Sequence, residues 1–483
     1  MTPIKLPSAL RPHHRRMESV LATRAPTVGA ELLGRLDVPG PRYTSYPTAD
    51  RFGPAFGAAD YRAALQRRAA GPAAAPLSVY VHVPFCESVC YYCACNKIVT
   101  RQHGRASAYL QTLEREIALH VAEIGTGQAV SQLHLGGGTP TFLDDAALTG
   151  LMRSLRGAFA IGPDAEISIE VDPRTVDRGR LEQLAALGFN RLSFGVQDFD
   201  PAVQHAVHRI QPYEAVRALM EAARAIGFRS TNVDLIYGLP MQTPASFART
   251  LEQVCTLEPE RIALYAYAHL PQRFKPQRRI DATSLPGAAA RVAMLAAAIA
   301  RFGDAGYVYV GMDHFARPDD PLAVAKREGR LHRNFQGYST QPDCDLIGLG
   351  VSAIGKVGDT YAQNAKTLDA YSSAIATGHF AVERGLCLNA DDRLRRDAIM
   401  ALMCQGRLDF ATLEQAHSIR FADRFADELR ALEPLQANGL VERHATHLEV
   451  TALGWFFVRS IASVFDGYLQ RGAPASTTYS RAV

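Results

Sequence analysis

Four of the eight cysteines in this chain lie close together, as Cys86, Cys90, Cys93 and Cys95. The first three follow the pattern C-x3-C-x2-C directly after an apolar run. Iron–sulfur clusters are held by thiolates, and a cubane normally takes four of them, so a loop that donates three leaves one iron open. This cysteine loop is therefore a strong candidate for a cluster with one exchangeable position.

Zinc is the alternative metal that clustered cysteines bind. Structural zinc usually takes paired C-x2-C knuckles, or histidines at a separate spacing. No second knuckle occurs here, because Cys255, Cys344, Cys387 and Cys404 stand alone. The pattern favours iron–sulfur chemistry, and a zinc-dependent binding protein without catalytic activity is the rival interpretation.

The elements that must position this loop alternate regularly between strands and helices. In the helix-like stretch 107–124, for example, Tyr109, Leu113, Ile117 and Val121 fall roughly on one face. About six strand–helix repeats predict an α/β fold with a parallel sheet, and nearly continuous apolar runs indicate strands buried on both faces. Periodicity alone fits an open sheet and a partial or closed barrel equally well. The apolar runs are 77–85, 131–138, 166–173, 190–197, 231–240 and 261–270.

Each predicted strand ends in reactive or flexible residues. The carboxyl ends of parallel strands meet at one edge of a sheet, which is where function collects in such folds. One such residue alone would be an ordinary strand-end cap, but several at the same edge favour a shared site. After the cysteine loop and "GGGTP", the later runs end in Glu170 with Asp172, Gln197, Asp234 and His269.

Composition excludes several classes of protein. The 483 residues carry a formal net charge of only +4, without a basic run interleaved with aromatics, which argues against a general nucleic-acid binder. No apolar run approaches the roughly 20 residues needed to cross a bilayer. The basic N-terminus lacks the apolar core of a secretory signal. We therefore expect a cytoplasmic protein without a membrane partner, in a compartment that keeps thiols reduced.

The cysteine pattern followed by "GGGTPT" resembles the radical S-adenosylmethionine (SAM) superfamily. In finer detail the chain resembles one family within it, the oxygen-independent coproporphyrinogen III oxidases of haem biosynthesis. The stretches that carry the resemblance are "GPRYTSYPTA" (40–49), "YVHVPFCESVCYYCACNKIVTR" (80–101), "LHLGGGTPTFL" (133–143), "SIEVDPRT" (168–175), "RLSFGVQDFD" (191–200), "VDLIYGLP" (233–240), "RNFQGYST" (333–340) and "GLGVSAIG" (348–355).

The resemblance implies a fold and an organisation into parts. The fold would be a (β/α)6-type partial barrel with an N-terminal arm and a mostly helical C-terminal domain. We expect a disordered extension over 1–35, an arm over the active site at 36–75, a catalytic domain over 76–375 and the C-terminal domain over 376–483. The last segment reads as helices with one short hairpin, and it is not markedly basic, which disfavours a winged-helix role in DNA binding.

The resemblance also implies the reaction. Cys86, Cys90 and Cys93 would hold a 4Fe–4S cluster whose open iron binds one SAM. An electron from the cluster would cleave SAM to a 5′-deoxyadenosyl radical, which would take a hydrogen atom from a propionate side chain. Loss of carbon dioxide and one electron would leave a vinyl group, and two such events would convert coproporphyrinogen III to protoporphyrinogen IX. Hydrogen abstraction from an unactivated carbon requires a cofactor.

Two sets of cofactor contacts carry over from the family by matching positions. The first SAM would be bound by Tyr80, Tyr92, Gly137, Gly138, Thr139 and Glu170, with glycines allowing close backbone approach. A second SAM would be bound by Gln197, Arg209, Asp234, Ala268 and Ile354. The fork of an arginine suits a carboxylate, although a lone arginine is more often part of a surface ion pair.

Tyr80 and Cys95 are the candidate catalytic residues, although Tyr80 could equally belong to the core. Cys95 lies too close to Cys93 to reach the fourth iron, so it is either a non-ligand near the cluster or substrate, or a buried structural thiol. The substrate carries four carboxylates, for which Arg42, Lys97, Arg101 and Arg333 are candidates by motif position.

The remaining expectations concern partners and a rival function. We expect a monomer that receives electrons from an unidentified low-potential donor. Relatives that share the cluster loop but bind and deliver haem are the main alternative. Those haem chaperones lack a cysteine at the place of Cys95 and lack the "PRYTSYPT" arm, whereas this chain has both.

Overall fold

A single curved sheet organises the molecule in the computed structural model, which describes residues 32, 40–71 and 75–470. Its twelve strands follow the order β16-β15-β14-β13-β1-β4-β5-β6-β7-β8-β10-β9. The order has two ends, so among the described residues the sheet is open and does not close into a barrel. The predicted disordered extension over residues 1–35 lies outside the described residues, apart from Leu32.

The centre of the sheet confirms the predicted strand–helix repeat. Six strands run parallel in sequence order, which requires a helical crossover after each one. These strands are β1 (Leu77–Val83), β4 (Gln128–Gly137), β5 (Phe159–Val171), β6 (Arg191–Gln197), β7 (Ser230–Tyr237) and β8 (Arg261–Ala266). The helices that cover them are α4 (Gly104–Ile124), α5 (Asp145–Ala158), α6 (Arg178–Ala186), α7 (Pro201–Ala206), α8 (Tyr213–Ile226), α9 (Pro244–Leu257) and α10 (Ala288–Asp304).

Local sequence signals explain where these helices begin. The Asp144 carboxylate accepts a hydrogen bond from the Ala147 backbone N–H at 2.8 Å and caps α5. Thr243 and Ser246 form a capping box at the start of α9, whose first residue is Pro244. Such caps satisfy backbone donors that have no partner within the helix.

The strands are not all buried on both faces, which corrects one expectation. β1 is nearly buried throughout, but β5, β6 and β7 alternate between buried and half-buried residues. Leu192, Phe194 and Val196 of β6 pack in the core, whereas Arg191 and Gln197 line a cavity on the inner face. The physical reason is that the concave face surrounds a ligand cavity in place of a second helix layer.

Further strands extend the sheet at both edges, through one more parallel pairing on β1 and through antiparallel pairings beyond it and beyond β8. Beyond β1 lie β13 (Leu346–Leu349), β14 (Ile354–Val357), β15 (Thr360–Asn364) and β16 (Val382–Cys387), with α12 (Leu368–Ala376) between the last two. Beyond β8 lie β10 (His314–Ala316) and β9 (Val308–Gly311). The sheet therefore continues past residue 375, where we expected the catalytic part to end.

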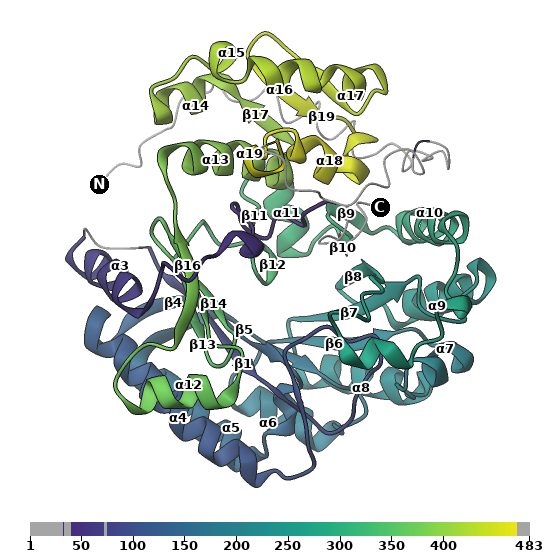
Figure 1. Cartoon of the computed structure of the whole chain (residues 1–483). Coiled ribbons are helices and arrows are strands. Elements are labelled where there is room, and N and C mark those ends of the chain that lie inside the picture. The colour runs from purple at the N-terminus through teal and green to yellow at the C-terminus, as the bar shows by residue number, and fades with distance from the viewer. Residues whose placement is uncertain (1–31, 33–39, 72–74, 471–483) are drawn as a thin grey trace, which may run out of the picture.

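The C-terminal region forms a second core above the sheet (Figure 1). A three-stranded sheet in the order β17-β19-β18 adds one strand to the predicted hairpin. The core also takes in Val310, Leu322 and Leu331 from before residue 376, so this core is not confined to the C-terminal segment. The elements are α11 (Pro321–Arg327), β11 (His332–Asn334), β12 (Gly337–Ser339), α13 (Ala390–Gln405), β17 (Arg407–Asp409), α14 (Phe410–His417), α15 (Phe421–Arg424), α16 (Ala426–Ala431), α17 (Glu433–Ala437), β18 (Val441–Arg443), β19 (His447–Val450), α18 (Val458–Ser463) and α19 (Gly467–Gln470).

The described part of the N-terminal arm joins the two cores. The Tyr43 hydroxyl donates to Asp466 at 3.0 Å, and Arg459 donates to the carbonyl of Pro41 at 3.0 Å. Further along, Gly53 pairs with Gly385 of β16, and α3 (Ala58–Ala70) packs on α4. The arm thus runs from the C-terminal region to the edge of the sheet. No helix in the described residues is long and apolar enough to span a membrane.

Candidate active site

The cysteine loop leaves the carboxyl end of β1 and is closed by a short parallel pairing. In this pairing β2 (Phe85–Cys86) lies beside β3 (Ile98–Val99), so the thiol-bearing residues form one compact loop. Cys86 and Cys90 are buried, Cys93 is half-buried, and all three line one cavity of about 450 Å³. Three sulfurs on one loop at a cavity wall fit a cluster that leaves one iron open to a ligand.

Polar groups from other elements are directed at these sulfurs. The Thr139 hydroxyl donates to the Cys86 sulfur at 3.5 Å, and the guanidinium groups of Arg174 and Arg209 donate to the Cys90 sulfur at 3.5 and 3.4 Å. Hydrogen bonds to cysteine sulfurs tune the reduction potential of iron–sulfur clusters. The donor set therefore fits an anionic cluster in chemistry as well as in ligand number.

The thiols differ in acidity. Burial raises the pKa of Cys86 to about 11. A hydrogen bond from Cys95, assisted by the nearby Lys97 ammonium, lowers the pKa of Cys93 to about 6. Metal binding requires the thiolate, so Cys93 is closer than Cys86 to its ligating form at neutral pH.

The glycines at the carboxyl end of β4 allow two backbone segments to approach each other closely. A Cβ at Gly138 would lie 2.7 Å from the Phe85 carbonyl oxygen, and Gly137 has φ +118°. The N–H groups of Gly138 and Thr139 donate to Val83 and Phe85 at 2.8 Å each. We expected glycine to admit a ligand here, and the structure adds that glycine also lets this turn dock on the start of the cysteine loop.

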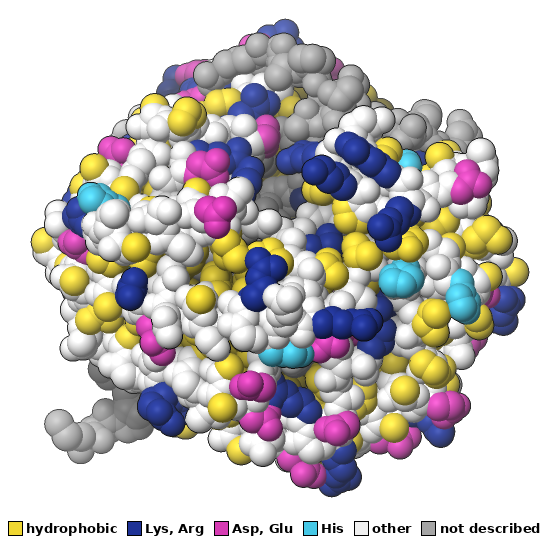
Figure 2. Space-filling model, turned by 60° about the horizontal axis from the view of Figure 1, so that its bottom comes forward, with side chains coloured by type: hydrophobic (Ala, Val, Ile, Leu, Met, Phe, Trp, Pro, Cys, Tyr) yellow, Lys and Arg dark blue, Asp and Glu magenta, His cyan; other side chains and the backbone are white. Residues whose placement is uncertain are grey.

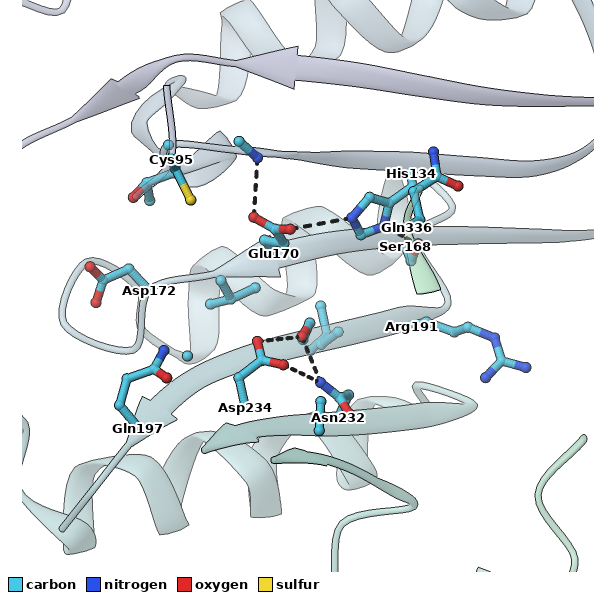
Figure 3. Close-up of a pocket in the computed structure, with 18 of the residues that line it drawn as sticks. Cys95, His134, Ser168, Glu170, Asp172, Arg191, Gln197, Asn232, Asp234 and Gln336 are labelled. Atoms are coloured by element: carbon cyan, nitrogen blue, oxygen red, sulfur yellow. Dashed lines mark hydrogen bonds and ion pairs between the residues drawn. The ribbon is translucent and has the colours of Figure 1, made fainter. Parts of the chain in front are cut away.

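Glu170 presents its carboxylate to the cavity from β5. The side chain is 43% exposed; one oxygen accepts from the Gly137 N–H at 3.1 Å and the other lies 3.5 Å from His134 Nε2. His134 is in turn fixed by Ser168 at 2.6 Å (Figure 3). A carboxylate held in place yet open to the cavity suits a ligand amino group.

Arg209 is held by Asp172 and does not contact Asp234. Its guanidinium lies 3.3 Å from Asp172, and Arg174 lies 2.6 Å from the same carboxylate. Although burial alone would raise it, these two cations hold the pKa of Asp172 below its ordinary value. Arg209 is 7% exposed, so it is part of a buried ion pair beside the cysteine loop rather than a surface one.

Gln197 and Asp234 lie on neighbouring strands of the cavity wall (Figure 3). Gln197 has φ +68° at an irregularity in the β6–β7 register, and a bulge of this kind re-aims a side chain. Asp234 accepts from Ser193 at 3.0 Å and from Asn232 at 2.9 Å. Burial, together with the charge of Glu170, raises the pKa of Asp234 to about 6.

The other predicted site residues divide into two groups. Tyr92 and Cys95 line the cavity, and Cys95 is exposed rather than buried in the core. Tyr80 stacks on His134 with ring centroids 5.8 Å apart, behind the residues that line the cavity. Ala268 and Ile354 are also absent from the lining, and Ile354 packs against the cluster of Phe52, Tyr361 and Leu388.

The candidate cations for the substrate are spread around the cavity. Lys97 lines it and donates to the Cys93 carbonyl at 3.0 Å. Arg42 lies 5.5 Å from the Tyr265 ring and Arg333 lies 4.6 Å from the Tyr338 ring, and both tyrosines line the cavity. Arg101 is exposed and is not part of the lining. Figure 2 shows Lys and Arg side chains gathered around a central hollow of the face it presents.

Sequence reasoning missed several polar residues on the inner face. The alternation of polar residues along β5, β6 and β7 was the available signal, since residues two apart share one face of a strand. The missed residues that line the cavity are His134, Glu166, Ser168, Arg174, Arg191, Ser193, Asn232, Arg261 and Gln336.

Comparison with known proteins identifies this arrangement. The sequence pattern of the Radical SAM superfamily matches residues 80–254, and that of the HemN C-terminal domain matches residues 388–457. The oxygen-independent coproporphyrinogen III oxidase of Escherichia coli (strain K12) is 52% identical over 92% of this chain and 96% of its own length. The protein of that name from Pseudomonas aeruginosa is 48% identical over 91% and 96%.

A solved structure agrees with these relatives. It is that of coproporphyrinogen III oxidase (HemN) from Escherichia coli, described as a radical SAM enzyme. It superimposes with a TM-score of 0.85 at 52% identity, covering 88% of this chain and 97% of that one. With this identity over nearly the whole length, the chain belongs to the family of oxygen-independent coproporphyrinogen III oxidases, radical SAM enzymes of haem biosynthesis.

Proposed function

We propose that this protein catalyses the oxygen-independent oxidative decarboxylation of two propionates of coproporphyrinogen III, giving protoporphyrinogen IX. The observation that carries the proposal is the three-cysteine loop, which opens onto the same cavity as Glu170, Asp234 and Arg209 in a chain of this family. When bound, the cluster and SAM supply the electron and the radical that remove a hydrogen atom from the substrate.

The chain's own residues bind and orient these groups. Cys86, Cys90 and Cys93 would hold the cluster, and Thr139, Arg174 and Arg209 donate hydrogen bonds to the sulfurs of Cys86 and Cys90. Glu170 would receive the amino group of the first SAM, with Tyr80, Tyr92 and the Gly137–Thr139 turn completing its surroundings. Cys95 faces the same cavity without a ligand role, close to the cluster or the substrate.

A second SAM site is part of the proposal. Gln197 and Asp234 line the cavity beside Glu170, and both are open to a ligand on the side facing the cavity. Arg209 is engaged by Asp172 and would act at the boundary between this site and the cluster. Ala268 and Ile354 would contribute only if the cavity closes further around the ligand.

The proposal extends to partners and location. Lys97, Arg42 and Arg333 are the cations proposed to meet substrate carboxylates. The protein would be a monomeric enzyme that receives electrons from a low-potential donor, and its unbridged cysteines fit a cytoplasm that keeps thiols reduced.

The decisive experiment is anaerobic reconstitution. Purified protein supplied with iron, sulfide, SAM, dithionite and coproporphyrinogen III should yield vinyl products detected by mass spectrometry. Activity should decay in air and return after anaerobic reconstitution. Sustained activity in aerated, iron-free protein would refute the radical mechanism.

Delivery of haem is the second candidate function, and the same preparation tests it. A haem chaperone should bind haem stoichiometrically and form no vinyl product. The exposed Cys95 and the ordered arm at residues 40–57 favour the enzyme.

A further inference from the structure

At the end of the cavity opposite the cysteine loop lie two arginines, Arg191 and Arg261, which we call the floor arginines. They are the first residues of β6 and β8, on either side of β7, and both line the cavity. Figure 3 shows Arg191 at the far end of the pocket from Cys95 and Gln197. β6 separates Arg191 from Gln197 by about 20 Å at its ordinary rise per residue.

Each floor arginine already has a carboxylate partner. Arg191 Nε lies 3.2 Å from Glu166, and Arg261 Nε donates to both oxygens of Asp320 at 2.9 Å. These pairs alone would be ordinary ion pairs at the amino ends of the parallel strands. The side chains are 11% and 15% exposed, so the remaining N–H groups have little access to bulk solvent.

The ion pairs do not account for all the donors. Among the described residues, Nη1 of Arg191, Nη2 of Arg261 and Nε2 of Gln336 are buried and have no hydrogen-bond partner. All three residues line the same cavity. Burial and the charge of Arg261 lower the pKa of Arg191 to about 10, so its cation is under-compensated. A buried donor without a partner is costly, and donors left over on a cavity wall point to a ligand that supplies the acceptors.

We propose that the floor arginines, with Gln336, form an anion subsite that binds one propionate carboxylate of the substrate. The guanidinium fork matches a carboxylate, and this part of the inference rests on the proposed function. The reacting propionate must lie near the cysteine loop, so the propionate held at the floor is a different one. The floor arginines are therefore positioning residues, which set the distance of the reacting ring from the radical source.

Equilibrium binding of coproporphyrinogen III tests this subsite. Cluster-loaded protein would be titrated anaerobically in the presence of S-adenosylhomocysteine, which cannot be cleaved reductively to the radical. Arg191→Gln and Arg261→Gln should each weaken binding roughly tenfold to hundredfold, the usual loss for a charge-assisted hydrogen bond. Iron content and substrate-free SAM cleavage should stay at the wild-type level. Arg229→Gln is the matched control, since Arg229 is exposed and directly precedes β7 at the same end of the sheet.

A second variant keeps the test decisive if a glutamine variant is unstable. Arg191→Lys retains a cation for Glu166 but loses the fork, so it should keep the melting temperature and still weaken binding. Unchanged affinity in Arg191→Lys and Arg261→Gln would overturn the subsite and assign both residues to structural ion pairs. If the wild-type protein itself bound no coproporphyrinogen, the proposed function would fail instead, which separates the two outcomes.

A separate group of metal-ligating side chains lies on the β18–β19 hairpin of the C-terminal region. Glu442 and Glu449 are opposite one another in the antiparallel pairing, and the His444 N–H donates to the His447 carbonyl at 2.9 Å. Side chains two apart on a strand share a face. The register therefore brings two imidazoles and two carboxylates together on one face, which we call the hairpin histidine site.

The distances in this site match a metal coordination sphere. His444 Nε2 lies 3.8 Å and His447 Nε2 lies 3.5 Å from the same oxygen of Glu449, and Glu442 lies 3.5 Å from His444. Ligand bonds of about 2.1 Å in a tetrahedron place neighbouring ligand atoms about 3.4 Å apart. The two rings are stacked, with centroids 4.3 Å apart, an arrangement that two imidazolium cations would oppose.

We propose that His444, His447 and Glu449 bind a zinc-class divalent cation, with Glu442 as an additional carboxylate. Neutral imidazole and carboxylate are ligands that zinc accepts. Arg407 of β17 lies opposite Glu449 in the β17–β19 strand pairing. Its positive charge would therefore oppose the binding of a cation. The site lies away from the cysteine loop and would clamp the hairpin rather than take part in the reaction.

Zinc binding by cluster-loaded, tag-free protein tests this site. After anaerobic equilibrium dialysis, elemental analysis should find one zinc ion fewer per chain in the His444→Ala/His447→Ala double variant than in the wild type. Arg407→Gln should bind zinc more tightly. His417→Ala is the control, because His417 pairs only with Asp397, at 2.8 Å. Equal zinc content in the wild type and the double variant would overturn the proposal.

Discussion

A buried carboxylate behind the sheet and a half-buried one on its cavity wall show how this molecule separates structure from function. Glu116 lies on α4 behind the sheet and accepts hydrogen bonds from Tyr371, the Gly350 N–H and Asn364 at 2.7, 2.7 and 2.6 Å. Asp234 lies on the cavity wall and accepts from Ser193 and Asn232. Burial raises the pKa of both carboxyl groups, to about 7 for Glu116 and about 6 for Asp234.

The difference lies in what surrounds each group. Glu116 is 1% exposed, and protein donors approach it from two other elements and a loop. Asp234 faces a cavity that also holds unpartnered donors such as Arg191 Nη1. A polar network whose hydrogen bonds are all made by protein groups stabilises the fold. A network that leaves polar groups without protein partners on a cavity wall is suited to bind a ligand.

The hydrogen-bond network around Glu116, which we call the outer network, has neighbours that also support the cysteine loop. The Tyr109 hydroxyl donates to the His82 carbonyl and accepts from the Val351 N–H at 3.2 Å. The His82 ring lies between the Tyr80 hydroxyl, at 3.0 Å, and the Asn96 carbonyl of the cysteine loop, at 2.9 Å. The loop therefore rests on a buried polar layer, so outer substitutions are expected to act through stability.

The largest effect is expected at the cysteine loop, where chemistry should fail while the fold remains. Replacing Cys86, Cys90 or Cys93 by Ala should abolish cluster retention and all SAM cleavage, because the cluster would keep only two of its three thiolate ligands. Iron analysis and the detection of 5′-deoxyadenosine measure both losses, and circular dichroism checks the fold.

Cys95→Ala is the matched control for those variants. Cys95 lines the same cavity but is not an expected ligand. Iron should stay near the wild-type level, with decarboxylation free to fall. An empty cluster site in Cys95→Ala would show that the ligands are assigned wrongly.

The next largest effect is expected in the network around Glu116, where a substitution should lower the stability of the fold. Glu116→Ala removes the acceptor of three buried donors, each worth about 1–3 kcal/mol when left unsatisfied, so the free energy of unfolding should fall by roughly 4 kcal/mol. Urea unfolding of cluster-free protein measures it. Glu114→Ala, an exposed position on the same helix, should change stability by less than about 0.5 kcal/mol. If Glu116→Ala lowered the free energy of unfolding by less than about 1 kcal/mol, Glu116 would not be the structural carboxylate that distinguishes it from Asp234.

How far the sequence anticipates these regions depends on the kind of signal. The six parallel strands, the crossover helices and the cysteine loop follow from periodicity and motif spacing, and the structure confirms them. The Glu116 network could not be predicted in this way. Its partners Gly350, Asn364 and Tyr371 lie more than two hundred residues along the chain and meet Glu116 only after the sheet has formed.

The site shows the same limit. Glu170 and Gln197 were found because they stand at the carboxyl ends of β5 and β6, and Asp234 was found by its family position although it lies inside β7. Arg191 and Arg261 were missed because they stand at the opposite ends, where sequence alone gives no reason to expect a cavity that extends the length of the strands. The partner of Arg209 was also missed, because Asp172 directly follows β5 whereas Arg209 lies in the connection from β6 to β7.

A smaller effect is expected at the proposed second SAM site. Arg209→Ala and Asp234→Ala should keep the cluster but weaken SAM binding roughly tenfold to hundredfold, since a charge-assisted contact is worth about 1.5–3 kcal/mol. Anaerobic equilibrium binding would count SAM molecules per chain, and the product assay would report decarboxylation. Unchanged stoichiometry and turnover in both variants would leave these residues as structural groups of the cavity wall.

The smallest effect is the contribution of Glu116 to the dependence of stability on pH. Burial raises the pKa of Glu116 to about 7 from an ordinary value of 4.5. Between these values the native state holds a proton that the unfolded chain has released, so stability falls as pH rises through the window, by at most about 1.4 kcal/mol per pH unit. Glu116→Gln cannot titrate, and the other groups cancel when the two proteins are compared. The unfolding free energy of the wild type minus that of Glu116→Gln should therefore decrease from pH 5 to 7 and level off above it. A constant difference would mean that the three donors keep Glu116 ionised throughout, and that the donors outweigh burial.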